Sequence, residues 1–169
     1  MAGLIASIAA ARNGARVLLM HDRPVLGGNA SSEIRMWIRG AAGKENRETG
    51  ILQEIEMENI YRNPTMNYSV WDSVLYQMVT QEKNITLLLN CSCLSCEMDG
   101  EKIASVIGWQ LNSYTFHTVK ARCLWIVPVT VFWLISPALH TVLAVKDRRS
   151  LMSTGRRRAR IAVPWALLC

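Results

Sequence analysis

The chain has 169 residues, half of them hydrophobic, which excludes a wholly disordered protein and is enough for one domain with a core. Its net charge of +6 would suit a nucleic-acid or anionic-membrane partner, but that charge is confined to one end. Residues 1–123 hold twelve Lys and Arg against twelve Asp and Glu, whereas residues 124–169 hold seven against one. Two compositions therefore meet near Cys123, and the balanced larger part favours neither nucleic acid nor a membrane as partner.

Five cysteines, an odd number without the spacing of a disulfide framework, favour a reducing compartment. The apolar start of the chain has no basic segment ahead of it, which indicates a core helix rather than a targeting signal, so we expect a cytoplasmic location. Cys91, Cys93 and Cys96 lie close together, but the pattern C-x-C-x2-C has no fourth ligand nearby. We expect these thiols to pack in the protein, with a metal site as the less favoured alternative.

The first predicted elements are a helix and a strand. Ala2–Arg12 is small and apolar almost all round, which is typical of a buried helix pressed against a sheet. Asn13-Gly14 ends that helix, because glycine readily adopts the positive φ of a helix C-cap. Arg16–Met20 is a continuous apolar run, as in a parallel strand covered on both faces. A helix, a glycine and a strand in this order form the second half of a βαβ unit.

Such a unit can carry the dinucleotide fingerprint G-x-G-x-x-G, which stands between the first strand and its helix. Met1-Ala2-Gly3 fits only the last three positions of that pattern. We therefore expect the chain to lack the first strand and the two glycines that approach the pyrophosphate. The sheet would then have an open place beside the Arg16–Met20 strand, where unpaired backbone groups favour aggregation.

An acidic residue should follow the second strand, about 20 residues after the fingerprint, and hold the ribose hydroxyls. Asp22, 19 residues after Gly3, is the candidate, although in such proteins the acidic residue more often stands one place earlier, at the position of His21. A turn aspartate ahead of Arg23-Pro24 is an equally good interpretation of Asp22.

A Gly-Gly pair follows in the stretch Arg23–Ser32. Gly27 and Gly28 would let the backbone approach a dinucleotide cofactor or its phosphates, and consecutive N–H groups there would form an anion-binding nest. Alternatively, the pair is a simple turn before an Asn or Ser helix cap. Its position directly after a strand of this kind favours cofactor binding.

The letters PVLGGNASSE at Pro24–Glu33 are followed by RMW at Arg35–Trp37 and RETGI at Arg47–Ile51. In this combination the sequence resembles the bacterial FAD-dependent oxidoreductases, some of which carry the label xanthan lyase, and the resemblance extends to about Ala121. It implies an α/β fold, an incomplete Rossmann-type FAD-binding domain, FAD as cofactor and a flavin-mediated redox reaction on an unknown substrate, possibly related to carbohydrates. The resemblance implies that Gly3 packs the first helix, Asp22 holds the ribose, Arg23 lies beside the adenosine, and Gly27, Gly28, Asn29 and Ser31 line the pyrophosphate and ribityl chain.

The middle of the chain fits this assignment. Apolar side chains at i, i+4 and i+8 over Val70–Val79 predict an amphipathic helix, and Ile85–Leu89 predicts a strand. Asp99-Gly100 predicts the type I′ turn of a hairpin. Three further strands are predicted at Cys91–Met98, Lys102–Trp109 and Tyr114–Val119. The resemblance implies that they form an antiparallel β-meander inserted between Rossmann elements.

The tail favours a different protein class at face value. Leu124–Val145 is apolar over about 20 residues and has basic residues on both sides, which predicts a transmembrane helix. Arg156–Arg160 adds a basic arm that would suit nucleic acid. A small membrane-anchored or nucleic-acid-binding protein that uses residues 124–160 is therefore the alternative function.

A shifted reading frame explains the tail better. When each codon is rebuilt from the last base of one residue's codon and the first two bases of the next, Trp125-Ile126 requires Asp and Phe132-Trp133 requires Leu. The remaining pairs from Leu124 to Lys146 permit VDCSGDSVLADFAGASHRAGRE, which resembles the next motif of the same family. We therefore divide the chain into a partial FAD-binding domain, residues 1–122, and an out-of-frame tail, residues 123–169. We expect an inactive fragment of an oxidoreductase, in which no catalytic residue can be named.

Overall fold

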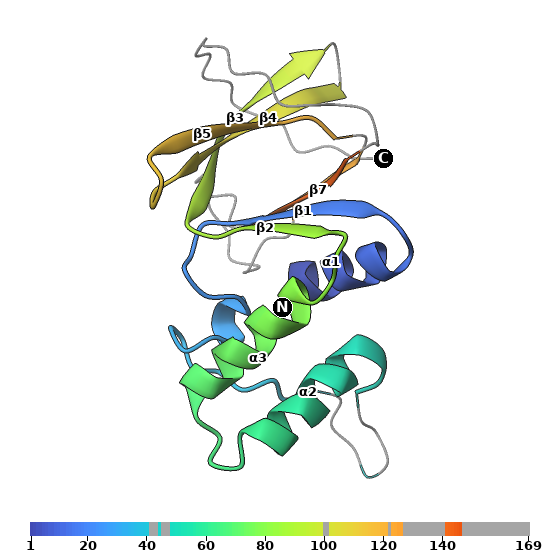
Figure 1. Cartoon of the computed structure of the whole chain (residues 1–169), viewed down its shortest axis with the longest axis vertical. Coiled ribbons are helices and arrows are strands. Elements are labelled where there is room, and N and C mark those ends of the chain that lie inside the picture. The colour runs from blue at the N-terminus through green and yellow to red at the C-terminus, as the bar shows by residue number, and fades with distance from the viewer. Residues whose placement is uncertain (41–43, 45–47, 100–101, 122, 127–140, 147–169) are drawn as a thin grey trace.

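The computed structural model describes residues 1–40, 44, 48–99, 102–121, 123–126 and 141–146. The helices in these ranges are α1 (Ala2–Arg12), the short 3-10 helix η1 (Gly28–Ala30), α2 (Gly50–Arg62) and α3 (Tyr68–Thr80). The strands are β1 (Arg16–His21), β2 (Ile85–Leu88), β3 (Cys91–Asp99), β4 (Lys102–Gln110), β5 (Thr115–Val119), β6 (Cys123–Ile126) and β7 (Thr141–Lys146). The strands form a four-stranded sheet and a three-stranded sheet. Figure 1 shows the helices on the other side of β1 and β2 from β3, β4 and β5, and this combination of helices and strands confirms the predicted α/β class.

The strand predicted at Arg16–Met20 lies inside the four-stranded sheet, whose order is β2-β1-β7-β6. This strand, β1, runs parallel to β2, with Val17 opposite Ile85 and Met20 opposite Leu88. Parallel neighbours need a long crossover, and here α2 and α3 lie in the connection between the two strands. The arrangement places the carboxyl ends of β1 and β2 at the same edge of the sheet.

The expectation of an open place in the sheet beside β1 is wrong. The open place expected beside β1 is occupied by β7, which pairs antiparallel along the whole strand from Arg16–Lys146 to His21–Thr141. The less favoured alternative of a transmembrane helix over Leu124–Val145 is contradicted at both ends, because β6 and β7 pair with each other as strands. Threonine and valine in the 141–146 segment favour a strand, and the bare edge of β1 offers the backbone partners that a strand needs. Residues 127–140 lie outside the described ranges, and no described helix is long and apolar enough to cross a membrane.

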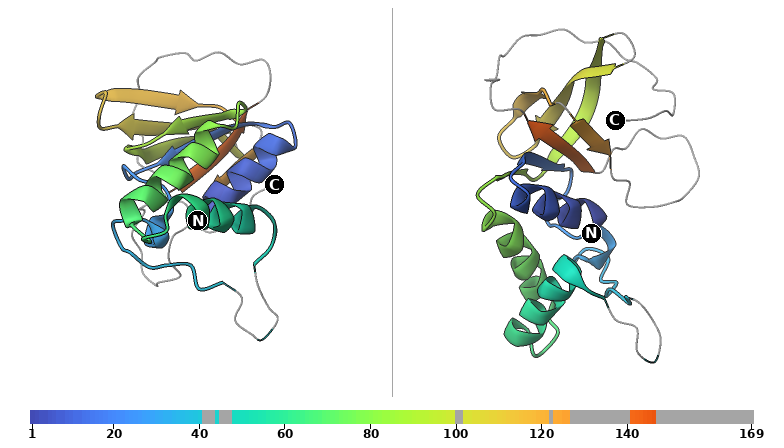
Figure 2. Two further views of the ribbon diagram at one scale, coloured as in Figure 1. Left: turned by 60° about the horizontal axis from the view of Figure 1, so that its bottom comes forward. Right: turned by 90° about the vertical axis from the view of Figure 1, so that its right-hand side faces the viewer.

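The helices cover one face of the four-stranded sheet, as Figures 1 and 2 show from three directions. Leu19 of β1 points into the main core cluster, where it meets Ile8 of α1 and Leu75 of α3, all at most 1% exposed. The buried face of α1 includes Gly3 and Ser7, and such small side chains let the helix lie close to the sheet. This close packing fixes where the first turn of α1 stands relative to the end of β1.

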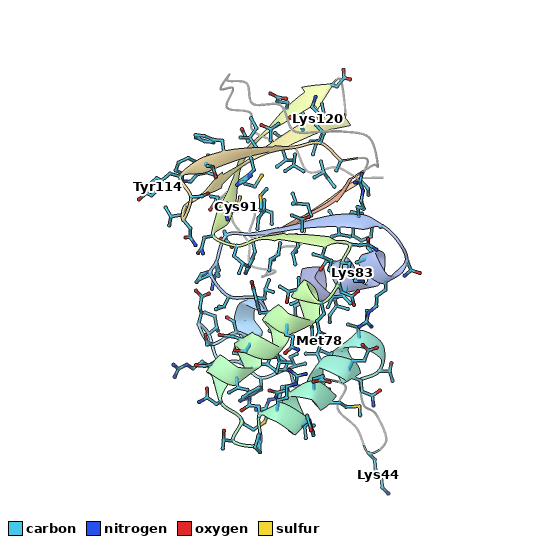
Figure 3. All side chains as sticks on the ribbon, viewed as in Figure 1. Lys44, Met78, Lys83, Cys91, Tyr114 and Lys120 are labelled. Carbon is cyan, nitrogen blue, oxygen red and sulfur yellow. The ribbon has the colours of Figure 1, made fainter. Side chains whose placement is uncertain are left out.

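The three-stranded sheet, in the order β3-β4-β5, covers the opposite face of β1. Its strands agree with the three predicted ones to within one residue at each end. Met20 of β1 and Cys91 of β3 are both 1% exposed and pack together, and Figure 3 shows Cys91 at the level between the two sheets. A Cβ on Gly108 would come within 2.7 Å of Met20 Cε and 2.9 Å of Cys91 Sγ. The glycine at this position therefore allows the two sheets to approach.

The packing of these cysteines predicts slow thiol chemistry. Burial raises the pKa of Cys91 to about 11. Burial, together with the neighbouring Cys96 and Cys91 thiolates, raises the pKa of Cys93 to about 11 as well. At pH 8 each should carry on the order of 100-fold less thiolate than an unperturbed cysteine. We expect iodoacetamide to label both slowly in the folded protein and faster as the pH rises, as followed by mass spectrometry with glutathione as reference. Labelling of Cys91 at the glutathione rate would contradict the packing.

Candidate functional site

A cavity of about 360 Å³ lies where the start of α1, the end of β1 and the loop containing η1 meet. This volume is at the lower end of the range of ligand pockets, roughly 300–1,000 Å³. Four of the seven residues that the sequence places at the cofactor line it: Gly3, Gly27, Gly28 and Asn29. Asp22, Arg23 and Ser31 lie beside the cavity but do not line it.

The first turn of α1 supplies backbone donors to this cavity. The first backbone hydrogen bond of the helix runs from Ile5 N–H to Met1 C=O, so the N–H groups of Ala2, Gly3 and Leu4 have no acceptor within the helix. The side chain of the N-cap residue, Met1, accepts no hydrogen bond from these N–H groups. The amino group of Met1 donates to Gly27 C=O at 3.2 Å, and burial lowers its pKa. The positive end of the helix dipole therefore opens into the cavity, an arrangement suited to an anion.

The Gly-Gly pair forms the facing wall. Gly27 has φ +108° and Gly28 has φ +62°, a region that other residues adopt only with strain. A Cβ on Gly27 would also stand 2.7 Å from Leu75 Cδ1, in the buried core. Glycine at position 27 is thus needed by the fold itself, whether or not a cofactor binds. The same backbone shape turns the start of η1 towards the cavity.

The loop around η1 is held from behind by hydrogen bonds to the side chains of Ser31 and Trp71. The hydroxyl of Ser31, fully buried, donates to Gly28 C=O at 2.7 Å and accepts from Glu33 N–H at 3.3 Å. The indole N–H of Trp71 donates to Ala30 C=O at 2.6 Å. Ser31 therefore supports the cavity wall, while Asn29 is part of the wall itself.

The end of β1 brings His21 to the cavity. His21 is 4% exposed and lines it, whereas the Asp22 carboxylate lies outside, with Oδ1 3.6 Å from His21 Nδ1. Arg23 turns away and pairs with Glu33 at 2.9 Å on the surface. His21 occupies the position at which the sequence pattern more often has an acidic residue. That offset was the only sign in the sequence that this side chain would line the cavity.

These residues fit a phosphorylated dinucleotide. The cavity combines the N–H groups of the first helical turn with two glycines of positive φ, and none of the described residues that line it is acidic. Its size suits one part of a large cofactor rather than the whole. Among the described residues, no group of three or more His, Cys, Asp or Glu is placed to hold a metal.

An α/β fold with such a cavity at the carboxyl end of a parallel strand belongs to the class of proteins that bind phosphorylated cofactors. The family model for FAD dependent oxidoreductase matches residues 1–124, and the chain belongs to that family. The family implies FAD as the cofactor and an oxidoreductase as the parent activity. No curated protein and no solved structure matches the chain significantly.

The segment Met36–Ile38 lines the cavity and was not expected there. Trp37 stacks on Tyr68 with ring centroids 4.4 Å apart and meets Trp71 edge-on at 5.7 Å. The RMW letters contribute to the family resemblance, but their spacing predicts no particular helix or strand. The sequence therefore offered no geometric reason to place the Trp37 indole at the site. Only the packing of α3 against the η1 loop brings it there.

Proposed function

We propose that residues 1–122 form the FAD-binding part of a flavin-dependent oxidoreductase, and that the cavity at the start of α1 holds the phosphate-bearing part of FAD. The observation that supports this best is the meeting of the uncapped α1 N-terminus with Gly27 and Gly28 across one cavity. The N–H groups of the first turn and of the Gly-Gly loop would bind the pyrophosphate oxygens. FAD supplies the redox chemistry when bound, and the protein orients it.

The finer roles follow from where the side chains lie. Gly3 would let the first turn of α1 approach the phosphates, and Asn29 would line the adjoining part of the cofactor. At the ribose we propose His21 as the contacting group, with Asp22 beside it, because the imidazole and not the carboxylate lines the cavity. Arg23 and Ser31 would act on the loop, through Glu33 and Gly28. By resemblance, the substrate would be a small molecule related to carbohydrates.

We further propose that residues 123–169 are translated out of frame, so that the polypeptide is not an active enzyme. Three observations support this: the change in charge near Cys123, the family phrase recovered from the shifted codons, and the end of the family match at residue 124. The DNA around codons 118–128 tests the proposal directly. A single insertion or deletion relative to an intact relative is expected there, and an uninterrupted frame in close relatives with the same tail would refute it.

The 169-residue polypeptide itself is expected to bind FAD weakly or not at all. It contains only the last glycine of the fingerprint, and the first strand and the other glycines normally supply much of the pyrophosphate site. Ultrafiltration with absorbance at the flavin bands measures retention. In the matched variant, the frame is restored after Ala121 and a strand ending in G-x-G is placed before Met1, and stoichiometric yellow protein is expected. Stoichiometric flavin bound to the 169-residue chain would contradict the prediction. Absence of bound flavin from both the 169-residue chain and the repaired variant would count against the assigned site.

A further inference from the structure

A second cavity, of about 190 Å³, lies between α2, α3 and the Met36–Ile38 segment. Trp37 and Ile38 line both this cavity and the one at the start of α1, so they form the partition between the two. The rest of the lining comes from Glu56, Asn59 and Ile60 of α2, Met66, and Trp71 of α3. Of the family motifs used above, only the last two letters of RETGI, Gly50 and Ile51, fall on α2, and neither residue lines this cavity. Apart from the shared partition, the cavity has no part in the proposed FAD site.

The lining is largely aromatic and aliphatic. Trp37 and Trp71 meet with ring centroids 5.7 Å apart and an interplanar angle of 63°, so the two indoles form a corner. Ile60 and Met66 close the other sides and are 68% and 48% exposed, which leaves the cavity accessible from solvent. Tryptophan faces attract cations more strongly than other aromatic side chains.

Among the described residues that line this cavity, only Glu56 is charged. Burial raises the pKa of its carboxyl group, and the nearby carboxylate of Glu48 raises it further. The neighbouring acids on α2 are paired, Glu54 with Arg12 and Glu58 with Arg62, each at 2.7 Å. Within the part of the chain that the structure describes, no arginine or lysine side chain forms an ion pair with Glu56. A carboxylate set in an aromatic cavity without a protein cation suits a cationic ligand.

The remaining polar group is already used by the protein. Asn59, 4% exposed, accepts through Oδ1 from Asn63 Nδ2 at 2.9 Å, and its own Nδ2 donates to Met66 Sδ at 3.9 Å. The amide therefore braces the wall and leaves Glu56 as the group that would select a ligand by charge.

We propose that this second cavity binds a small organic cation, an ammonium group on an apolar body of about one aromatic ring, with Glu56 as counter-ion and Trp37 and Trp71 as the enclosing walls. The size follows from the volume, because an engineered apolar cavity of about 150 Å³ holds one benzene molecule. The ammonium group lies at the carboxylate and the apolar body lies in the indole corner. The site does not depend on FAD, so it stands or falls independently of the proposed cofactor site.

Benzylammonium tests this site on the full chain, by tryptophan fluorescence and calorimetry at low ionic strength and pH 7. We expect saturable binding, at least tenfold tighter than that of the neutral benzyl alcohol, and none with benzoate. Glu56→Gln should remove the preference for the cation, whereas Glu58→Gln, on the same helix and away from the cavity, should keep it. The proposal would be contradicted if benzylammonium showed no saturable binding, or if it bound no more tightly than benzyl alcohol.

A second variant guards against a folding effect. Glu56→Gln should leave the thermal midpoint unchanged or higher, because the folded state disfavours the Glu56 charge. Should the variant melt lower, Ile60→Trp replaces it, since a bulky ring at this exposed position fills the mouth of the cavity and should cut benzylammonium affinity at least tenfold. Unchanged affinity in Ile60→Trp would overturn the site.

Discussion

Gly27→Ala is expected to destabilise the folded chain by about 2–5 kcal/mol, measured by urea unfolding. Two costs act together. At φ +108° any side chain is strained, and the new Cβ would stand 2.7 Å from Leu75 Cδ1, which the core does not let move freely. In the frame-repaired protein the larger Gly27→Val should also lose its flavin, because the displaced loop no longer presents its N–H groups to the cavity.

Gly14→Ala is the matched control. Gly14 also has a positive φ, +87°, but a Cβ there would meet nothing within 4 Å. Its replacement should therefore cost only the backbone strain, about 1–2 kcal/mol, and should leave flavin retention unchanged. Equal destabilisation by the two substitutions would show that the contact with Leu75 plays no part.

Several elements of the fold could be predicted from the sequence, because the pattern of apolar residues in each agrees with its burial in the structure. Ala2–Arg12 is apolar all round and is buried beside β1, and Arg16–Met20 is apolar throughout and is covered on both faces. The spacing over Val70–Val79 predicted the buried side chains of α3, among them Trp71 and Leu75. For the first two elements, the lack of a polar side indicates burial on every side. For α3, the helical period of its apolar side chains indicates which side faces the core.

The neighbours of β1 could not be read in this way. An apolar run of about 20 residues predicts a membrane helix from hydropathy alone, whereas the structure uses its last residues as β7, beside β1. Pairing between segments more than 100 residues apart is decided by the free edge and not by local sequence. The same limit applies to the site, where the orientation of the β1 end selects His21 over Asp22 and the packing of α3 brings in Trp37.

Trp71 is expected to be the side chain whose loss costs most. It is 1% exposed, belongs to the main core cluster and contacts Trp37 edge-on. Trp71→Ala should destabilise the chain by about 3–5 kcal/mol, enough to unfold a marginal domain, as judged by urea unfolding and near-ultraviolet circular dichroism. The fold thus depends on a residue that also forms the back of the η1 loop.

Trp71→Phe separates packing from hydrogen bonding at the same position. Phenylalanine keeps an aromatic ring in the core but cannot donate to Ala30 C=O, which Trp71 Nε1 reaches at 2.6 Å. Because Ala30 is buried, the unpaired carbonyl should cost about 1–3 kcal/mol and loosen the loop that lines the cofactor cavity. Hydrogen exchange of the amides at residues 27–31 should accelerate more than tenfold relative to those of β4. Trp109→Phe, on β4 of the outer sheet, is the control and should leave these amides unchanged, so equal exchange in both variants would refute the role of the Trp71 hydrogen bond in holding the loop.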